Sequence, residues 1–298
     1  MVRDNKHNLR EEINMKRCSQ IFLLVLFSLF LVVSSVWGQN LHVLVNIWDG
    51  TEMPVVENLY DRGKLPFLSS IGPLYNLSSN EDCFDGTCMK TLTKPQHATM
   101  LTGCLADVHG VYTNNNFQLI PDGITVYEII EASNSEYKTA HVSGKPLHFG
   151  LPTFGNIVTD VDFFEAGISP SMATDTVINL IDLWKDNSFF IVCHFKNPDA
   201  IGHKYGIDSR QYRRAIKQDD TQLGSLLATL DANKANAETI VYVLADHGFG
   251  CPKPTNHPCS PNTFITSNNV NLTGDLFMND VAGFLLSHFG LSPSPVCQ

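Results

Sequence analysis

A hydrophobic strand that runs into a polar segment decides the fold: residues 188–206 read SFFIVCHFKNPDAIGHKYG. Residues 188–195 are almost continuously apolar, as expected for a strand buried on both faces of a parallel sheet. Two further segments have the same character, 41–48 (LHVLVNIW) and 239–245 (TIVYVLA). Since helical patterns separate these strands, the sequence predicts a doubly wound α/β fold, with a mostly parallel sheet and helices on both faces.

The remaining elements follow from periodicity. We expect a further strand at 137–143, and helices at 53–63, from Gln96 onward, and at 124–133, 171–184, 209–230 and 279–289. After Gln39 the chain has no long linker, repeat or low-complexity block. Residues 39–298 are therefore predicted to form a single compact domain.

Acidic and histidine residues follow three of the predicted strands. The first strand ends at Asp49, the second leads into Asp199, and the third ends in Asp246 and His247. Taken singly, each pattern is typical of a turn or a helix cap. Together they place oxygen and imidazole ligands at one edge of the sheet, where functional residues of this architecture gather. Converging carboxylates need a cation to offset their repulsion, so this edge is predicted to bind divalent metal, with zinc favoured by the mixed ligands.

Six motifs in a fixed order extend this prediction: Asp49-Gly50, Thr93-x-Pro95-x-His97 with Thr102-Gly103, His109-Gly110, Asn114, Pro198-Asp199-x-x-Gly202-His203-x-x-Gly206 and Ala245-Asp246-His247-Gly248. In this order the chain resembles the type I phosphodiesterase/nucleotide pyrophosphatase family of the alkaline phosphatase superfamily. The resemblance covers roughly residues 41–290. It implies an alkaline-phosphatase-like catalytic domain that hydrolyses phosphodiester or pyrophosphate bonds.

The resemblance also implies two zinc ions and assigns their ligands. Asp199, His203 and His257 would hold one ion. Asp49, Asp246 and His247 would hold the other, with Thr93 bridging to it as the nucleophile. Asn114 would bind the transferring group. A metal is needed because a threonine hydroxyl is a weak nucleophile until its pKa is lowered. Thr91 and Thr99 are interpreted as structural residues, whereas His97 occupies a family position without a metal role.

Other functions share this architecture. Sulfatases have Cys or Ser in place of Thr93, yet the segment from Gly144 to His148 (GKPLH) resembles their Gly-Lys-x-His element with one residue extra. Lys145 and His148 would then bind anionic oxygens of a phosphate or sulfate ester. A phosphomonoester hydrolase, a phosphoethanolamine transferase and a non-catalytic secreted metal-binding relative are the further alternatives.

The N-terminal segment and the cysteines indicate export. Lys16 and Arg17 precede an apolar run at 21–33, so residues 1–38 are predicted to contain a signal peptide after a polar extension, or alternatively a signal anchor. The spacing of Cys83 with Cys88 and of Cys251 with Cys259 suggests disulfides in an exported chain, or alternatively zinc knuckles. Cys193 is expected to be a buried free thiol. The two glycosylation sequons begin at Asn76 and Asn271.

The overall charge restricts the partners. Lys and Arg number 20 against 30 Asp and Glu, which gives a net charge of −10. A nucleic-acid scaffold protein would instead carry a basic stripe. We therefore expect a small-molecule phosphate ester as substrate, such as a nucleotide or a lipid head group, in a secreted or lumenal protein. Membrane association is expected only if the N-terminal segment is an uncleaved anchor.

Overall fold

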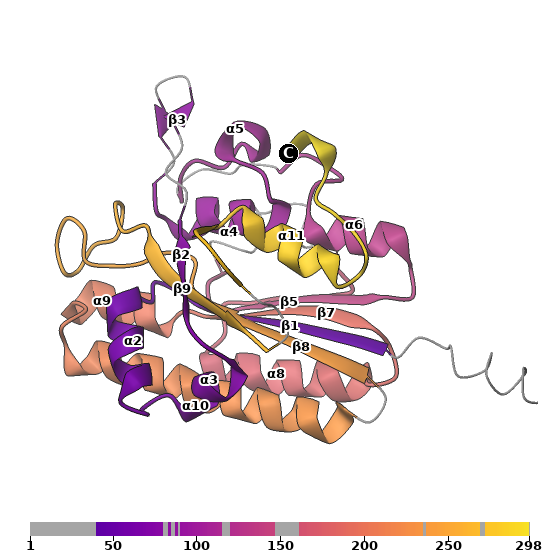
Figure 1. Ribbon diagram of the computed structural model, residues 1–298, viewed down its shortest axis with the longest axis horizontal. Helices are drawn as coiled ribbons and strands as arrows, with labels where there is room; N and C mark the ends of the chain where they lie inside the picture. Colours follow the sequence, from indigo (N-terminus) through magenta and orange to yellow (C-terminus); the bar gives the residue numbers. More distant parts are fainter. Residues whose placement is uncertain are drawn as a thin grey trace, which may run out of the picture. The chain divides into compact units, whose positions relative to one another are not determined.

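The strands form one eight-stranded sheet in the order β10-β2-β9-β8-β1-β7-β5-β6 (Figure 1). The computed structural model describes residues 40–79, 83–84, 87–88, 90–114, 120–146, 161–234, 237–268 and 272–297. The strands are β1 (Asn40–Trp48), β2 (Tyr75–Ser78), β5 (Lys138–Ser143), β6 (Phe163–Ala166), β7 (Phe189–Phe195), β8 (Ala237–Leu244), β9 (Asn262–Ser267) and β10 (Leu276–Phe277). The neighbours β8, β1, β7, β5 and β6 run parallel, whereas β9 is antiparallel to β8 and β2. The predicted mostly parallel sheet is therefore confirmed.

Helices cover both faces of the sheet (Figure 1). One layer contains α4 (Thr93–Thr102), α5 (Ala106–His109), α6 (Val126–Ser133) and α11 (Asp280–Ser287). The other contains α2 (Met53–Asp61), α3 (Pro66–Ile71), α8 (Pro170–Leu183), α9 (Asn197–Tyr205) and α10 (Arg210–Asn233). A small hairpin of β3 (Cys83–Phe84) and β4 (Thr87–Cys88) and a short 3-10 helix, η2 (Pro295–Cys297), complete the described elements. Among the described residues, no helix combines the length and hydrophobicity that a bilayer crossing requires.

The alternation of side chains along β1 explains why the sheet needs both layers. Val43, Val45 and Ile47 belong to the apolar core on the α4–α6–α11 side. Leu44 and Trp48 belong to the core on the α8–α10 side. Because successive residues of a strand point to opposite faces, an unbroken apolar run requires cover on both sides. The hydrophobic character of 41–48 is thereby accounted for.

The structure moves several predicted boundaries and adds one disulfide. The helix expected at 209–230 continues to Asn233, and the helix expected at 279–289 ends at Ser287. The helix expected from Gln96 begins three residues earlier, at Thr93, and ends at Thr102; the next residue, Gly103, has a φ of 73°, which is favourable for glycine. Cys251 is bonded to Cys259 as suggested, and Cys104 is bonded to Cys297, a pair not foreseen. Cys193 is a buried free thiol, as predicted. The hairpin places Cys83 opposite Cys88 in backbone register.

Several predictions concern residues outside the described ranges. These are the signal peptide or anchor within residues 1–38, the sequon at Asn271 and the side chain of His148. The other sequon residue, Asn76, is exposed on β2. The structural description starts at Asn40, so the division between residues 1–38 and 39–298 stays a prediction.

A buried carboxyl on α10 makes the stability of the fold dependent on pH. Asp220 accepts hydrogen bonds from the backbone N–H groups of Leu68 (2.7 Å) and Phe67 (3.4 Å) at the start of α3. Burial nevertheless raises its pKa to about 6. The folded state thus binds this proton more tightly than the unfolded chain, whose Asp pKa is about 3.9. The free energy of unfolding contributed by Asp220 therefore falls as the pH rises from about 4 to about 6.

Asp220→Asn tests this account. Asparagine keeps an acceptor oxygen for Leu68 but does not ionise. In thermal melts, the Tm of the variant relative to the wild type is expected to rise steadily between pH 4 and pH 7. Asp220→Ala, which removes the acceptor as well, should be less stable than Asp220→Asn at every pH. A Tm difference between Asp220→Asn and the wild type that is the same at pH 4 and pH 7 would contradict the assignment.

Candidate active site

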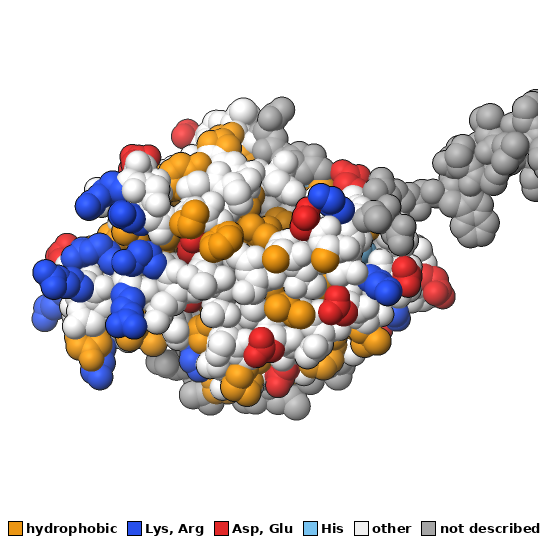
Figure 2. Space-filling model, turned by 90° about the horizontal axis from the view of Figure 1, so that it is seen from below, with side chains coloured by type: hydrophobic (Ala, Val, Ile, Leu, Met, Phe, Trp, Pro, Cys, Tyr) orange, Lys and Arg blue, Asp and Glu red, His pale blue; other side chains and the backbone are white. Residues whose placement is uncertain are grey.

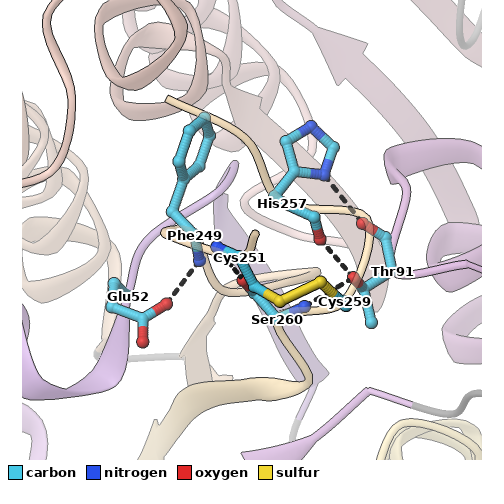
Figure 3. The surroundings of a disulfide bond; sticks show 7 residues. All are labelled: Glu52, Thr91, Phe249, Cys251, His257, Cys259 and Ser260. Carbon is cyan, nitrogen blue, oxygen red and sulfur yellow. Dashed lines mark hydrogen bonds between the residues drawn. A yellow bond between two sulfur atoms is a disulfide. The ribbon is translucent and has the colours of Figure 1, made fainter. Parts of the chain in front are cut away.

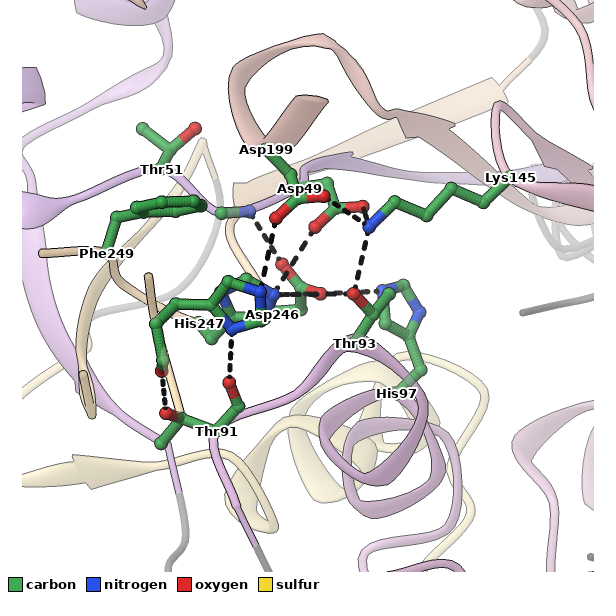
Figure 4. A network of polar contacts seen from close by, with 12 residues as sticks. Asp49, Thr51, Thr91, Thr93, His97, Lys145, Asp199, Asp246, His247 and Phe249 are labelled. Carbon is green, nitrogen blue, oxygen red and sulfur yellow. Dashed lines mark hydrogen bonds and ion pairs between the residues drawn. The ribbon is translucent and has the colours of Figure 1, made fainter. Parts of the chain in front are cut away.

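Four neighbouring parallel strands deliver polar side chains to the same edge of the sheet. Asp49 follows β1, Asp199 lies on α9 after β7, and Asp246 and His247 follow β8. Lys145 comes from the segment after β5. Figure 4 shows these side chains converging on a common centre from separate elements. Three of the four strand ends are those that the sequence predicted, and the position of β5 next to β7 brings in Lys145 as well.

The converging residues form two groups that could each hold a metal ion. One group is Asp49, Asp246 and His247, and the other is Asp199, His247 and His257, with candidate ligand atoms within 4.8 Å of one another in each group. The side chain of His203 is half-exposed, and its Nε2 lies 3.4 Å from Asp199 Oδ1 and 3.2 Å from His257 Nε2. The structure therefore brings together all the histidine and aspartate ligands that the sequence predicted.

The three histidines present the same ring nitrogen to the centre. Nδ1 of His203, His247 and His257 lies 3.0, 2.8 and 2.7 Å from the backbone carbonyl oxygens of Thr255, Gly248 and Thr91, respectively. A carbonyl oxygen only accepts, so each Nδ1 carries the proton. In the neutral ring this leaves a lone pair on Nε2, the tautomer that a metal ligand requires. Burial lowers the pKa of His257 to about 3, which keeps that ring neutral.

In each of the three carboxylates, Asp49, Asp199 and Asp246, one oxygen has a partner within the protein and the other has none. Oδ2 of Asp49 and Oδ2 of Asp199 lie within 2.8 Å of Lys145 Nζ, and Oδ1 of Asp246 accepts from the backbone N–H of Gly50 (3.0 Å). The other oxygens, Asp49 Oδ1, Asp199 Oδ1 and Asp246 Oδ2, are buried and have no hydrogen-bond partner. A buried carboxylate oxygen without a partner is costly. Each of these three oxygens is therefore suited to bind a cation directly.

The spacing of these atoms fits a tetrahedral zinc site. Ligand atoms around an ion with bonds of about 2.0–2.1 Å lie about 3.3 Å from one another. Asp199 Oδ1 is 3.4 Å from the Nε2 atoms of both His203 and His257. Similarly, His247 Nε2 lies 3.5 Å from Asp49 Oδ1 and 3.5 Å from Asp246 Oδ2. These separations are too long for good hydrogen bonds but suit ligands that share a metal ion.

Thr93 lies beside His247, which belongs to both groups of candidate metal ligands. It is the first residue of α4 and is buried, with its Oγ1 3.4 Å from His247 Nε2 and 3.0 Å from Lys145 Nζ. Asn114 approaches the same turn and accepts a hydrogen bond from the backbone N–H of Lys94 (2.9 Å), which leaves its side-chain NH₂ as a donor. Because α4 starts at Thr93, the N–H groups of its first turn are close to the hydroxyl, where an anion would be favoured.

Lys145 bridges the two carboxylates and the hydroxyl. Its Nζ is 2.5 Å from Asp49 Oδ2, 2.8 Å from Asp199 Oδ2 and 3.0 Å from Thr93 Oγ1. Burial alone would lower the pKa of Lys145, but the two carboxylates outweigh it and hold the pKa above its ordinary value. The ammonium is therefore charged. Even so, burial and the neighbouring Asp246 raise the pKa of Asp49 to about 8, against the opposing effect of Lys145.

Thr91 fixes the loop that carries His257 (Figure 3). Its backbone oxygen accepts from His257 Nδ1, and its hydroxyl donates to the His257 carbonyl. The same hydroxyl accepts from the backbone N–H of Ser260 (3.0 Å). The disulfide between Cys251 and Cys259 closes this loop. Thr91 therefore has a structural role, as predicted, because its hydrogen bonds hold His257 in position next to Asp199.

Two buried histidines near the site were not assigned a role from the sequence. His194 on β7 contacts Asp49 Oδ2 through Nε2 (3.1 Å), and its Nδ1 lies 3.2 Å from Ser143 Oγ. Nε2 of His97 is 3.5 Å from Asp246 Oδ2. Burial lowers the pKa of His194 to about 3 and that of His97 to about 4, so both are neutral. A polar residue within an apolar strand was the available signal for His194.

Comparisons with known proteins show what the chain as a whole is similar to. Residues 156–286 match the family model described as type I phosphodiesterase / nucleotide pyrophosphatase. A bis(5'-adenosyl)-triphosphatase of Xenopus laevis is 27% identical over 53% of this chain and 38% of its own length. An ectonucleotide pyrophosphatase/phosphodiesterase family member 3 of Rattus norvegicus is 26% identical over 53% of this chain and 20% of its own. The chain thus spans well under half the length of these relatives.

Solved structures share the fold at low sequence identity. A 2-O GAG sulfatase superposes with a TM-score of 0.62 at 13% identity, covering 87% of this chain and 72% of the other. The alkaline phosphatase of the Antarctic bacterium TAB5 gives a TM-score of 0.58 at 14% identity, covering 84% of this chain and 97% of the other. The sequence matches show that the chain is similar to type I phosphodiesterases/nucleotide pyrophosphatases, and the superpositions show that it shares the fold of the alkaline phosphatase.

Proposed function

We propose that the chain is a zinc-dependent hydrolase of phosphodiester or pyrophosphate bonds, with Thr93 as its nucleophile. The observation that carries the proposal is the set of three unpartnered carboxylate oxygens facing the Nε2 atoms of His203, His247 and His257. Asp199, His203 and His257 would hold one ion, and Asp49, Asp246 and His247 the other. Bound zinc would lower the pKa of the Thr93 hydroxyl and neutralise phosphate oxygens.

The residues of the chain supply the positioning. Thr93 Oγ1 would attack phosphorus and release the leaving group, which gives a phosphothreonine that water then hydrolyses. Lys145 donates to Oγ1 (3.0 Å) and so favours the oxyanion form of this oxygen. The free NH₂ of Asn114 and the first turn of α4 would bind the oxygens of the transferring phosphate. Lys145 would also contact these oxygens, as the GKPLH segment suggested, and His148 is proposed to join it.

The relatives and the disulfides support a proposed substrate class and location. The Xenopus relative bears the name bis(5'-adenosyl)-triphosphatase, so a nucleotide-type phosphate ester is the proposed substrate, ahead of a lipid head group. The bonds between Cys104 and Cys297 and between Cys251 and Cys259 support an oxidising compartment. We accordingly propose that the protein acts in the secretory pathway or outside the cell.

A chelation experiment tests the proposal. The purified chain is expected to contain two zinc ions by elemental analysis and to hydrolyse bis(4-nitrophenyl) phosphate. Removing the metal with a chelator should reduce the rate by about 10³-fold or more, and added zinc should restore it. 4-Nitrophenyl phosphate and 4-nitrophenyl sulfate, assayed in parallel, separate the alternatives. Faster turnover of the sulfate would favour a sulfatase, and stoichiometric zinc without turnover of any ester would favour a non-catalytic metal-binding protein.

A further inference from the structure

His194, the last but one residue of β7, lies beside the candidate metal ligands. It points to the α4 side of the sheet, as do the core residues Val192 and Phe190 at alternate positions before it. Its side chain is fully buried, and its Nε2 lies 3.1 Å from Asp49 Oδ2. A buried polar side chain in an otherwise apolar strand is costly unless it is hydrogen-bonded, so the partners of both ring nitrogens matter.

The partners of His194 determine which nitrogen carries its proton. Asp49 Oδ2 accepts from the ammonium of Lys145 (2.5 Å), so it is an acceptor for the histidine as well, and His194 Nε2 is the donor. In the neutral imidazole, Nδ1 is then an acceptor. Its partner is the hydroxyl of Ser143, which is paired in register with His194 on the neighbouring strand β5 and lies 3.2 Å from Nδ1. Ser143 therefore donates to His194, and His194 donates to Asp49.

Lys145 completes a closed circuit of hydrogen bonds. Its backbone N–H donates to Ser143 Oγ (3.2 Å), while its ammonium donates to the same oxygen of Asp49 that His194 contacts. The side chain of Lys145 is only 13% exposed, in contrast to the Lys and Arg side chains that gather at one end of the face in Figure 2. The circuit is therefore largely shielded from water, which strengthens its hydrogen bonds.

The circuit leaves the two oxygens of Asp49 in different situations. Oδ2 accepts from two donors, Lys145 Nζ and His194 Nε2. Oδ1 is buried without a hydrogen-bond partner and lies 3.5 Å from His247 Nε2. Rotation of the carboxylate would exchange the oxygens, but the donors on Oδ2 come from two different strands and oppose any tilt away from this orientation. Asp49 is thus held with one oxygen directed at the candidate metal position.

We propose that His194 is a positioning residue for the metal ion assigned to Asp49, Asp246 and His247. It orients Asp49 so that Oδ1 faces that ion, and through Ser143 it fixes the segment that carries Lys145. The inference rests on the proposed function, because it takes this group to bind zinc. Hydrogen-bonded partners of ligating carboxylates orient them, and their loss costs about 10- to 100-fold in metal affinity. Since the other group does not contain Asp49, the effect should be confined to one of the two ions.

Zinc binding in the absence of substrate tests this role. Titration of the metal-free chain with zinc, in competition with a chromogenic chelator, is expected to give two dissociation constants. His194→Leu should raise one of them about 10- to 100-fold and leave the other within about threefold of the wild type. His194→Gln, whose side-chain NH₂ replaces the Nε2 donor, should recover most of this loss.

His141→Leu is the matched control. His141 is a buried histidine on β5, and its Nδ1 lies 2.7 Å from the hydroxyl of Tyr127 on α6. The variant removes a ring of the same size from the neighbouring strand. It is expected to bind both zinc ions as the wild type does, whatever it loses in Tm.

The tautomer of His194 gives a second measurement that needs neither metal nor activity. Nitrogen-15 NMR of the metal-free chain, with His194→Gln used to assign the resonances, should place the proton of His194 on Nε2. His247 and His257, whose Nδ1 atoms face backbone carbonyls, should carry theirs on Nδ1. A ring that were only a packing element would have no reason to differ from them.

Three results would overturn the proposal: a proton on Nδ1 of His194, wild-type affinity for both ions in His194→Leu, or equal weakening of both ions that His194→Gln does not recover. Failure of the proposed function is a separate outcome. A wild type that binds two zinc ions but hydrolyses no ester would lack the activity, whereas the affinities of the variants would still decide the role of His194.

Discussion

Thr93→Ala is expected to lower kcat for phosphodiester hydrolysis by about 10³-fold or more while leaving the zinc content unchanged. The Thr93 hydroxyl oxygen lies 3.0 Å from Lys145 Nζ and 3.4 Å from His247 Nε2. Alanine removes the proposed attacking atom and is compatible with the first turn of α4, since it is a good helix former. Steady-state kinetics and elemental analysis of the same preparation measure both quantities.

Two controls make this prediction specific to the nucleophile. Thr93→Ser retains a hydroxyl at the same position and should keep most of the activity that alanine loses. Thr99→Ala removes another buried hydroxyl of α4, one that lies 3.0 Å from His109 Nε2, and should cost stability rather than rate. Should Thr93→Ala retain activity within about tenfold of the wild type, another group is the nucleophile.

Lys145→Met is expected to reduce kcat/KM by about 10²-fold to 10³-fold, the effect of losing one preorganised donor at a reacting oxygen. A second effect should appear in the metal-free protein. There the ammonium is the cation that lies between Asp49 Oδ2 and Asp199 Oδ2, so its loss leaves buried carboxylates uncompensated. Breaking a buried ion pair in this way costs about 3–5 kcal/mol.

The two effects of Lys145→Met are separable by chelation. Thermal melts should show a larger loss of Tm for the chelated variant than for the zinc-loaded one, because bound zinc would neutralise the same carboxylates. Lys196→Met is the matched control, since Lys196 packs against Gly144 beside the same segment but makes no ion pair with the described carboxylates. If both variants melt and turn over alike, the role assigned to Lys145 is incorrect.

The edge of the sheet that carries the candidate metal ligands was largely predictable from the sequence, because two simple rules determine it. Continuous apolar runs indicated which segments form parallel strands, and the carboxyl ends of parallel strands lie at one edge of the sheet. Asp49, Asp199 and Asp246 therefore had to lie at one edge of the sheet once the strand assignments were correct, and the order β8-β1-β7 makes them neighbours. Their geometry around a common centre is what the structure adds to that prediction.

Other features depend on tertiary contacts that periodicity does not encode. The contact of His194 with Asp49 requires β1 and β7 to be paired in register, so a histidine in an apolar run gave no indication of its partner. The bond between Cys104 and Cys297 joins residues 193 positions apart, a pairing that spacing alone leaves open. The start of α4 was misplaced because Pro95 suits several positions in a first helical turn.

The attachment of the His257 loop to Thr91 has a dynamic consequence. Thr91 lies two residues before Thr93, and it makes hydrogen bonds to both His257 and Ser260. Moving the loop independently would break all of these bonds at once, at a cost comparable to that of a local unfolding event. Any opening of the site that admits a substrate should therefore move Thr93 and His257 together as one rigid unit. The backbone torsion angles would then change in the segments on either side of that unit.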